Sequence, residues 1–409
     1  MYLKKDIIFT KGSTNSTLVD RKSGNVYHLN TEATEFIDKH IKTGFEEKNK
    51  EDEQEFIEFL RKENLLCVDC KEASLHETLK INRSNSLCRK SFAWIEVTTR
   101  CNLRCLHCYN ESSIHSTKAL TLEQYYDIID NLQNYGISRV QIIGGEPLVL
   151  GEDILKRMIQ YTYGKFESIE LFTNGTLLNE AMIQWLKDYN VKLAISIYSY
   201  SHDIHDNVTT VVGSYEKTMK NVKLLKKYCV TYRVANVLMK GVEIKEANTD
   251  LYKPNSRKDI LRLSGRGNLH LMTRELLIKK LITEERFSHS LPQYVIEGIM
   301  QGHNCFSTKI YIGVDGMVYP CVMERRFNYG SIFEKSLNEI LNQSSFISKD
   351  DVNECKNCEY RYICFDCRPD SISNNIYEKP WYCTYKPQEG RWEDKEQFVE
   401  RLCEKYSIT

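Results

Sequence analysis

The stretch that decides the fold is Phe92–Tyr109, FAWIEVTTRCNLRCLHCY. Its first seven residues are rich in apolar and aromatic side chains, as in a β-strand. Cys101, Cys105 and Cys108 follow directly, separated by three and two residues. Three thiolates suit an iron–sulfur cluster with one iron left open, or a catalytic zinc ion with one open position. We therefore expect a strand that delivers three metal ligands to a single loop.

The same strand begins a regular alternation of apolar strands and amphipathic helices. We expect strands at 92–98, 139–143, 168–172, 192–198, 231–239 and 259–264, and helices at 121–136, 152–163, 179–189, 214–228 and 273–285. Parallel βα units produce this order. Six units predict an α/β fold, a partial (β/α)6 TIM-like barrel over residues 92–288. The site of such a barrel lies at the carboxyl ends of the strands, which is where the cysteine loop falls.

Residues 1–75 are expected to form a small unit of their own. Short strands at 6–10, 16–20 and 25–30 precede a helix capped near Asn30 or Thr31 and a second helix that carries Phe56. Three strands followed by helices predict a winged-helix-like α+β domain. The polar residues 76–91 are expected to be a linker.

The sequence after the barrel is rich in cysteine and has little apolar periodicity. A hairpin is expected at 309–322, turning at Asp315-Gly316. A region with so few core residues is expected to need metal to hold its shape. We assign residues 289–390 to this domain and 391–409 to a C-terminal helix. The candidate metal ligands are Cys305, Cys321, Cys355, Cys358, Cys364, Cys367 and Cys383.

Composition excludes several classes of protein. Lys+Arg and Asp+Glu both number 56 in 409 residues, so no basic field attracts nucleic acid or an acidic membrane. No apolar run approaches the roughly 20 residues that span a bilayer. The run Ile7–Phe9 is too short for the core of a signal peptide and reads as a strand. Fifteen cysteines without an export signal indicate metal or redox chemistry in the cytoplasm.

The cysteine loop after the first barrel strand resembles that of the radical SAM superfamily. The resemblance implies that Cys101, Cys105 and Cys108 hold a [4Fe–4S] cluster. The open iron would bind the amino and carboxylate groups of S-adenosylmethionine. Members usually have an aromatic residue just before the third cysteine, and here that position is His107, whose flat ring could meet adenine.

Three strand ends strengthen the resemblance. The second strand ends in GGEP, where glycines allow close backbone approach and a glutamate can accept from an ammonium group. The third ends in TNGT and the fourth in SIYS, in which Tyr198 stands where many members have an acid. Arg262 or Arg266 could hold the cofactor carboxylate, or form only a surface salt bridge. The implied cofactor contacts are His107, Tyr109, Gly144, Gly145, Glu146, Pro147, Asn174, Ser196 and Arg262.

The C-terminal cysteines resemble the SPASM extension, which carries two auxiliary clusters. By that pattern Cys355, Cys358, Cys364 and Cys383 complete one [4Fe–4S] cluster, so that the chain holds three with the first. The remaining Cys305, Cys321 and Cys367 would hold the other, with an open iron for a substrate thiolate or a fourth ligand from elsewhere. A zinc ribbon built on the two CxxC pairs is the alternative.

Residues 24–44 resemble the PqqD-like recognition element of enzymes that modify ribosomally made peptides. The resemblance implies that residues 1–75 bind the leader of a precursor peptide by β-augmentation, in a groove formed by Val26–Leu29 and the helix at 53–64. DNA binding by a winged helix is the alternative. The neutral charge and the acidic second helix count against it.

Together the resemblances imply a radical SAM peptide maturase. One electron, from a donor such as a flavodoxin or ferredoxin, cleaves S-adenosylmethionine, and a 5′-deoxyadenosyl radical takes a hydrogen from the peptide. A cysteine thiolate then attacks the carbon radical, which gives the thioether of sactipeptides or ranthipeptides. The alternatives are a carbon–carbon link made by the same parts, and a metal-dependent regulator with a winged helix and a zinc ribbon.

Overall fold

The computed structural model describes residues 1–46, 51–68, 90–242, 257–300, 303, 306–344 and 347–408. Most of the predicted linker at 76–91 and the predicted ligand Cys305 lie outside these ranges. Within them, no helix is both long and apolar enough to cross a bilayer.

The barrel is one open sheet with the strand order β11-β10-β9-β8-β7-β6-β12-β13-β14. Neighbouring strands from β6 to β11 are parallel. The prediction of an α/β fold built on six parallel strands is therefore confirmed. The six strands are β6 (Phe92–Glu96), β7 (Arg139–Ile143), β8 (Ser168–Thr173), β9 (Lys192–Ser196), β10 (Tyr232–Leu238) and β11 (Arg257–Ile260).

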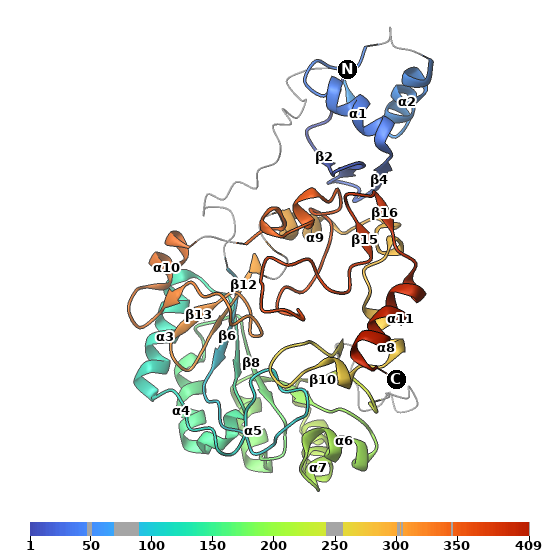
Figure 1. Cartoon of the computed structure of the whole chain (residues 1–409). Coiled ribbons are helices and arrows are strands. Elements are labelled where there is room, and N and C mark those ends of the chain that lie inside the picture. Colours follow the sequence, from blue (N-terminus) through green and yellow to red (C-terminus); the bar gives the residue numbers. More distant parts are fainter. Residues whose placement is uncertain are drawn as a thin grey trace.

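Helices cover the outer face of this sheet (Figure 1). In β8, Ile169 and Leu171 are buried in the core beneath them, whereas Glu170 and Phe172 on the inner face are half-buried. The capping box of Thr121 and Gln124 forms as expected at the start of the first helix. The helices are α3 (Leu122–Tyr135), α4 (Glu152–Thr162), α5 (Glu180–Asp188), α6 (His202–Thr209) and α7 (Ser214–Lys227).

Several elements differ from the prediction. The strand expected at 259–264 is β11, which ends at Ile260, and the helix expected at 391–409 is α11 (Lys395–Tyr406). Residues 202–209, for which no helix was predicted, form α6, because this turn buries His205 and Val208 and because Leu106 N of the cysteine loop donates to Val208 O at 2.9 Å. The helix expected at 273–285 is shorter, α8 (Arg274–Lys280), followed by a 3-10 turn, η4 (Glu284–Phe287). It ends because Ile282 N donates to Tyr382 O at 2.8 Å, a contact between distant segments.

The expected C-terminal hairpin forms from β12 (Lys309–Ile312) and β13 (Met317–Tyr319), and Gly316 takes a positive φ of 76° at its turn. β12 also pairs in parallel with β6, so the hairpin extends the barrel sheet, which the sequence did not predict. The elements around it are α9 (Gln293–Met300), β14 (Gly330–Ser331), α10 (Leu337–Gln343), η6 (Lys349–Asp351), η7 (Cys355–Asn357), β15 (Tyr385–Lys386), β16 (Arg391–Trp392) and α11 (Lys395–Tyr406).

The N-terminal unit is an antiparallel sheet packed between two cores. Its elements are β1 (Tyr2–Leu3), β2 (Ile7–Lys11), β3 (Ser16–Asp20), β4 (Val26–Leu29), α1 (Thr31–His40), α2 (Glu51–Lys62) and β5 (Leu66–Cys67), with the sheet order β2-β3-β4. One face packs Leu18 against the helices. The other packs Val19 with Tyr360 of the cysteine-rich region, so the unit sits on that region (Figure 1). The predicted strands and helices are confirmed.

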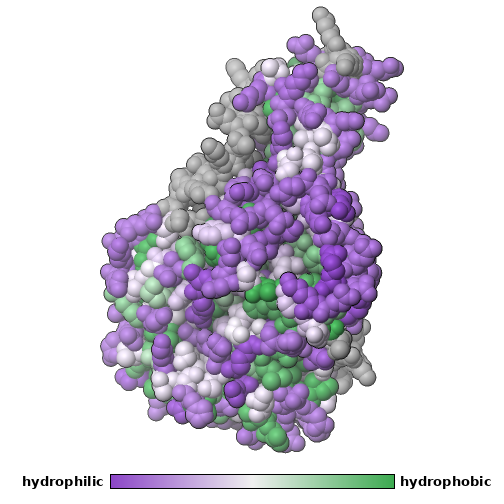
Figure 2. Space-filling view, viewed as in Figure 1, coloured by the Kyte–Doolittle hydropathy of each residue, from purple (hydrophilic) through white to green (hydrophobic). Residues whose placement is uncertain are grey.

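The face of the molecule seen in Figure 2 is mostly hydrophilic, and its apolar surface is broken into patches. Scattered exposed apolar side chains are normal in soluble proteins. The exposed apolar residue that matters below is Phe59 on α2, which is 37% exposed.

Candidate functional site

The three cysteines of the opening stretch lie on the loop that leaves the carboxyl end of β6. Long-range hydrogen bonds hold this loop. Arg266, on the turn after β11, donates from Nε to Cys105 O at 2.9 Å and from its backbone N–H to Cys108 O at 3.0 Å. The turn after the edge strand β11 therefore helps to position the cysteines that follow β6.

Burial dominates the chemistry of these thiols. Cys101 is only 8% exposed. Burial, reinforced by the charge of Glu146, raises the pKa of Cys101 far above its ordinary value, and burial raises the pKa of Cys105 to about 12. A metal cluster deprotonates such thiols and supplies the positive charge that the site lacks. The donor set is soft and buried, as an iron–sulfur cluster requires.

The glycines of GGEP are required by the cysteine loop itself. A Cβ on Gly144 would lie 2.4 Å from Thr98 O, and one on Gly145 would lie 2.2 Å from Arg100 O. The backbone N–H of Gly145 donates to Thr98 O at 2.7 Å, and that of Glu146 donates to Arg100 O at 2.9 Å. Side chains here would push β7 and the loop apart.

The carboxylate of Glu146 is fully buried beside this loop. Its Oε1 accepts from Thr173 Oγ1 at 2.7 Å and from Leu148 N at 3.1 Å, and its Oε2 accepts from Asn174 N at 2.7 Å. Burial raises the pKa of Glu146 to about 7, although these donors oppose the shift. Pro147 opens the short turn η1 (Pro147–Leu150), where its missing N–H is no loss. A cationic ligand would favour the ionised carboxylate.

The side chain of Asn174 ties the third strand to the cysteine loop. Its Nδ2 donates to Asn102 Oδ1 at 2.9 Å and lies 4.0 Å from Cys101 Sγ, while its Oδ1 accepts from Thr176 N at 2.9 Å. The contact of Asn102 with Asn174 was not predicted from the sequence. The position of Asn102 directly after the first cysteine was the available signal.

The carboxyl ends of the parallel strands form the rim of the barrel. The next group on this rim consists of Ser196, Tyr198 and His107. Ser196 ends β9, is 9% exposed and bonds to the Tyr198 hydroxyl. The ring of Tyr198 meets that of His107 edge-on, with centroids 4.8 Å apart. Burial lowers the pKa of His107 to about 4, so the ring is neutral, and its buried Nδ1 has no hydrogen-bond partner in the described part of the chain. A flat neutral ring with an unpaired nitrogen fits a planar, hydrogen-bonding ligand such as adenine.

Tyr109 points away from this group. Burial, and after it the charge of Glu96, raises the pKa of the Tyr109 hydroxyl. The charge of Arg325 opposes this shift and that of Cys321 adds to it. Glu96 is buried at the end of β6, accepts from Asn110 Nδ2 and accepts from a backbone N–H after β12. Tyr109 therefore lies on the side of the C-terminal hairpin.

Arg262 and Arg266 occupy different places. Arg266 holds the cysteine loop, as described above. Arg262 pairs with Asp259 at 2.9 Å. Burial alone would lower the pKa of Arg262, but the charges of Cys367 and Asp259 raise it. The structure thus places Arg262 near a C-terminal cysteine, and its contact with the cofactor carboxylate stays a prediction.

The structure brings four C-terminal cysteines together, Cys355, Cys358, Cys364 and Cys383. Burial raises the pKa of Cys358 well above its ordinary value, and the charges of the other three add to this shift. The remaining two described candidates lie apart from the four. Cys321 is buried after the hairpin, and Cys367 N donates to the Tyr382 hydroxyl at 2.8 Å.

In the described part of the chain, no group of three or more His, Cys, Asp or Glu side chains converges on the position of one metal ion. Cysteine thiolates suit both a zinc ribbon and an iron–sulfur cluster.

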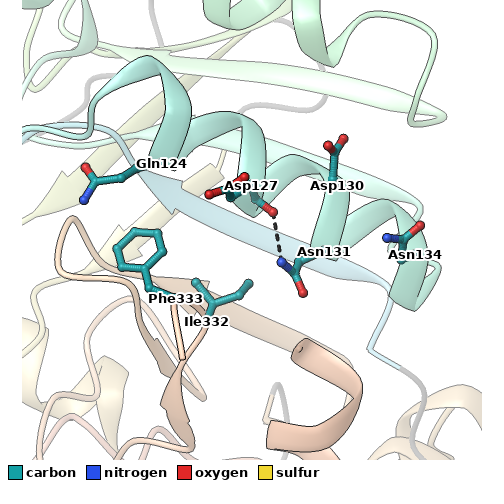
Figure 3. A pocket seen from close by; sticks show the side chains of 7 residues that line it. All are labelled: Gln124, Asp127, Asp130, Asn131, Asn134, Ile332 and Phe333. Atoms are coloured by element: carbon teal, nitrogen blue, oxygen red, sulfur yellow. Dashed lines mark hydrogen bonds between the residues drawn. The ribbon is translucent and has the colours of Figure 1, made fainter. Parts of the chain in front are cut away.

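A surface hollow of about 490 Å³ lies away from these residues. It is lined by polar side chains of α3 and by Ile332 and Phe333, and Figure 3 shows that Asp130 points away from these two apolar residues. It is an outer groove between a barrel helix and the segment after β14. It contains none of the cysteines, so we do not assign the site to it.

Comparison with known families agrees with this geometry. Residues 95–250 match the radical SAM superfamily, and residues 305–368 match SPASM, an iron–sulfur cluster-binding domain. The first match contains the cysteine loop and all strand ends up to β10. The second begins at Cys305 and ends just after Cys367.

Relatives and solved structures extend the likeness. The chain is 27% identical to the antilisterial bacteriocin subtilosin biosynthesis protein AlbA of Bacillus subtilis, over 78% of this chain and 75% of that protein. It is 25% identical to the cysteine-type anaerobic sulfatase-maturating enzyme of Clostridium novyi, over 68% and 90%.

Two solved structures share the fold. The structure titled native anSMEcpe with bound AdoMet and Cp18Cys peptide has a TM-score of 0.54 at 17% identity, covering 77% of this chain and 96% of that chain. Streptococcus suis SuiB bound to the precursor peptide SuiA has a TM-score of 0.50 at 15% identity, covering 92% and 99%. The chain therefore contains a radical SAM domain followed by a SPASM iron–sulfur cluster-binding domain.

Proposed function

We propose that the chain is a radical SAM maturase that binds a ribosomally made precursor peptide and forms thioether links from its cysteines. The observation that carries the proposal is the position of three cysteines beside Glu146 at the carboxyl ends of the strands, with Cys101 buried and Cys105 and Cys108 half-buried. The name of the Bacillus subtilis relative, a bacteriocin biosynthesis protein, supports the substrate class.

The residues of the rim would each do one task. Cys101, Cys105 and Cys108 hold the cluster, and the carboxylate of Glu146 accepts hydrogen bonds from the ammonium group of S-adenosylmethionine. Asn174 keeps Glu146 and the cysteine loop in register through the bonds described above. When bound, the cluster and S-adenosylmethionine supply a radical that removes one hydrogen atom from the peptide.

The C-terminal cysteines would complete the reaction. A thioether needs a second hydrogen to leave, as a thiol proton and one electron, and an auxiliary cluster is the acceptor that we propose for that electron. Cys305, Cys321 and Cys367 would leave one iron open for the peptide thiolate. With the rim cluster, the proposed cofactor set is three [4Fe–4S] clusters and S-adenosylmethionine.

The leader would bind to the N-terminal unit. β4 pairs only with β3 among the described strands, so it is an edge of its sheet. An edge strand can accept a peptide strand through its backbone. Beside it, the rings of Tyr27 and Phe59 lie 5.9 Å apart and Phe59 stacks on Phe56 at 6.0 Å, which gives the groove an aromatic wall on α2.

Replacing Phe59 by serine is expected to weaken leader binding about tenfold or more, because an aromatic ring that becomes buried on binding contributes about 1.5–3 kcal/mol. Fluorescence anisotropy with the labelled leader of a candidate precursor peptide measures this. Phe333→Ser is the matched control, since Phe333 is 38% exposed and Phe59 is 37% exposed. Equal losses in both variants would contradict the proposed groove.

Mass spectrometry of the precursor after anaerobic co-expression tests the chemistry. We expect the peptide to lose two hydrogens per cross-link and to lose one alkylatable thiol each time. Hydrogen loss with every thiol still alkylatable would instead show carbon–carbon links, the second product that these parts could make. The maturase proposal would be contradicted if the peptide stayed unmodified and if its binding to the protein did not depend on the leader.

The regulator hypothesis has less support. A winged-helix and zinc-ribbon regulator has no use for a cysteine loop on barrel strand ends, nor for a match to the radical SAM superfamily over 95–250. Anaerobically purified protein that contained zinc but no iron or acid-labile sulfide would support the regulator hypothesis.

A further inference from the structure

The cysteine-rich region contains buried ions that the proposed chemistry has not used. Asp366 is fully buried, and its carboxylate lies 2.6 Å from Lys349 Nζ, 2.6 Å from Arg368 Nη2 and 2.7 Å from His303 Nε2. The side chains of Lys349 and Arg368 are each only 2% exposed. Burying charges in this way is unfavourable unless all of them are paired.

The charges of these contacting side chains do not balance. Lys349 and Arg368 carry two positive charges, and Asp366 offers one negative charge. Basic nitrogens lie within 2.7 Å of both oxygens of the Asp366 carboxylate. Among the described contacts of this group, at least one buried positive charge therefore has no anion of its own.

A cluster held by the neighbouring cysteines would supply that anion. Asp366 stands between Cys364 and Cys367 in the sequence, which places the ion group inside the cysteine loop. The charge of Lys349 acts on both Cys364 and Cys355. These are two of the four cysteines assigned to one auxiliary cluster.

A third cation borders the same cysteines. Lys379 Nζ donates to Tyr385 O at 2.7 Å and pairs with Glu354 at 3.0 Å, and Cys383 is the first charge that acts on it. Glu354 is 47% exposed, so solvent screens its charge, whereas Lys379 is 16% exposed. The four cysteines are therefore bordered by the cations Lys349 and Lys379 and by the buried acidic side chains Asp366 and Glu359.

We propose that Lys349 is a positioning residue for the auxiliary cluster of Cys355, Cys358, Cys364 and Cys383, and that its ammonium group raises the reduction potential of this cluster. The inference rests on the cofactor set proposed above. Reduction adds one negative charge to the cluster, and a buried cation beside it stabilises the reduced form. The effect favours uptake of the electron released when the thioether forms.

Potentiometric titration of the anaerobically reconstituted full chain, followed by electron paramagnetic resonance, tests this. In Lys349→Met we expect the ratio of reduced to oxidised auxiliary cluster at a fixed potential to fall at least about tenfold, because one nearby charge is lost from a buried site. The signal of the S-adenosylmethionine-binding cluster should keep its midpoint. Lys349→Arg, which keeps the charge, should stay near the wild type.

Lys356→Met is the matched control, since Lys356 follows Cys355 directly but is exposed. It removes the same charge and should leave the midpoint unchanged, because water screens it. If Lys349→Met fails to hold its iron, Lys349→Gln is measured in its place. An unchanged midpoint in a variant with full iron content overturns the inference. A wild-type protein without auxiliary-cluster signals overturns the proposed cofactor set itself, which is a separate result.

Discussion

Replacing Cys101 by alanine is expected to abolish reductive cleavage of S-adenosylmethionine. Two thiolates cannot hold a cluster that needs three, and Cys101 is the most deeply placed of the set at 8% exposure. We expect a loss of more than about 100-fold, which is larger than the effect of removing a residue that only orients a metal ligand. Formation of 5′-deoxyadenosine under anaerobic reducing conditions measures the rate.

Cys229→Ala is the control for this variant. Cys229 is exposed after α7, and the proposal gives it no ligand role. Its replacement should leave the rate and the iron content unchanged. Cleavage at the normal rate by Cys101→Ala would show that the loop does not hold the reactive cluster, and the proposed function would then fail.

Replacing Glu146 by glutamine is expected to weaken binding of S-adenosylmethionine by about tenfold to a hundredfold. The carboxylate is buried, and a hydrogen bond to a charged group is worth about 1.5–3 kcal/mol. Glutamine keeps the shape but loses the charge that would pair with the ammonium group. The NH₂ group of glutamine would also face one of the N–H and O–H donors that now bond to the carboxylate, so that donor would lose its acceptor.

Equilibrium binding of S-adenosylmethionine to the reconstituted chain measures this effect, with thermal unfolding measured alongside. Glu216→Gln, on the exposed first turn of α7, removes the same charge at the surface and should change neither quantity. Full affinity in Glu146→Gln would remove Glu146 from the cofactor site. If both variants lost the folded state, the weaker binding of S-adenosylmethionine would reflect lower stability and not a lost contact.

Much of the fold follows from local sequence, because its signals act over a few residues. The Thr121 capping box and the strand at Phe92 depend on neighbours in the chain, and both form as predicted. α6 was missed because its one buried face, with His205 and Val208, has meaning only against the cysteine loop. The end of α8 was misplaced for the same reason, since it depends on Tyr382.

The candidate site divides in the same way. The spacing of Cys101, Cys105 and Cys108 and the GGEP segment can be read from the chain, because their chemistry depends on residue type and spacing. The separate places of Arg262 and Arg266 could not be read. Four residues apart on one turn, they face different sets of cysteines, and only packing decides which guanidinium reaches which set.

Sequence alone determined most of the order of the elements, the candidate ligands on the first loop and the kind of cofactor they suit, because periodicity and spacing are local properties. Tertiary structure decided what lies beside those ligands. It joined β12 to β6, seated the N-terminal sheet on the cysteine-rich region, and buried Lys349 against Asp366 and Cys364. Each of these contacts unites distant segments, and a charge gains its strength only where folding excludes water from it.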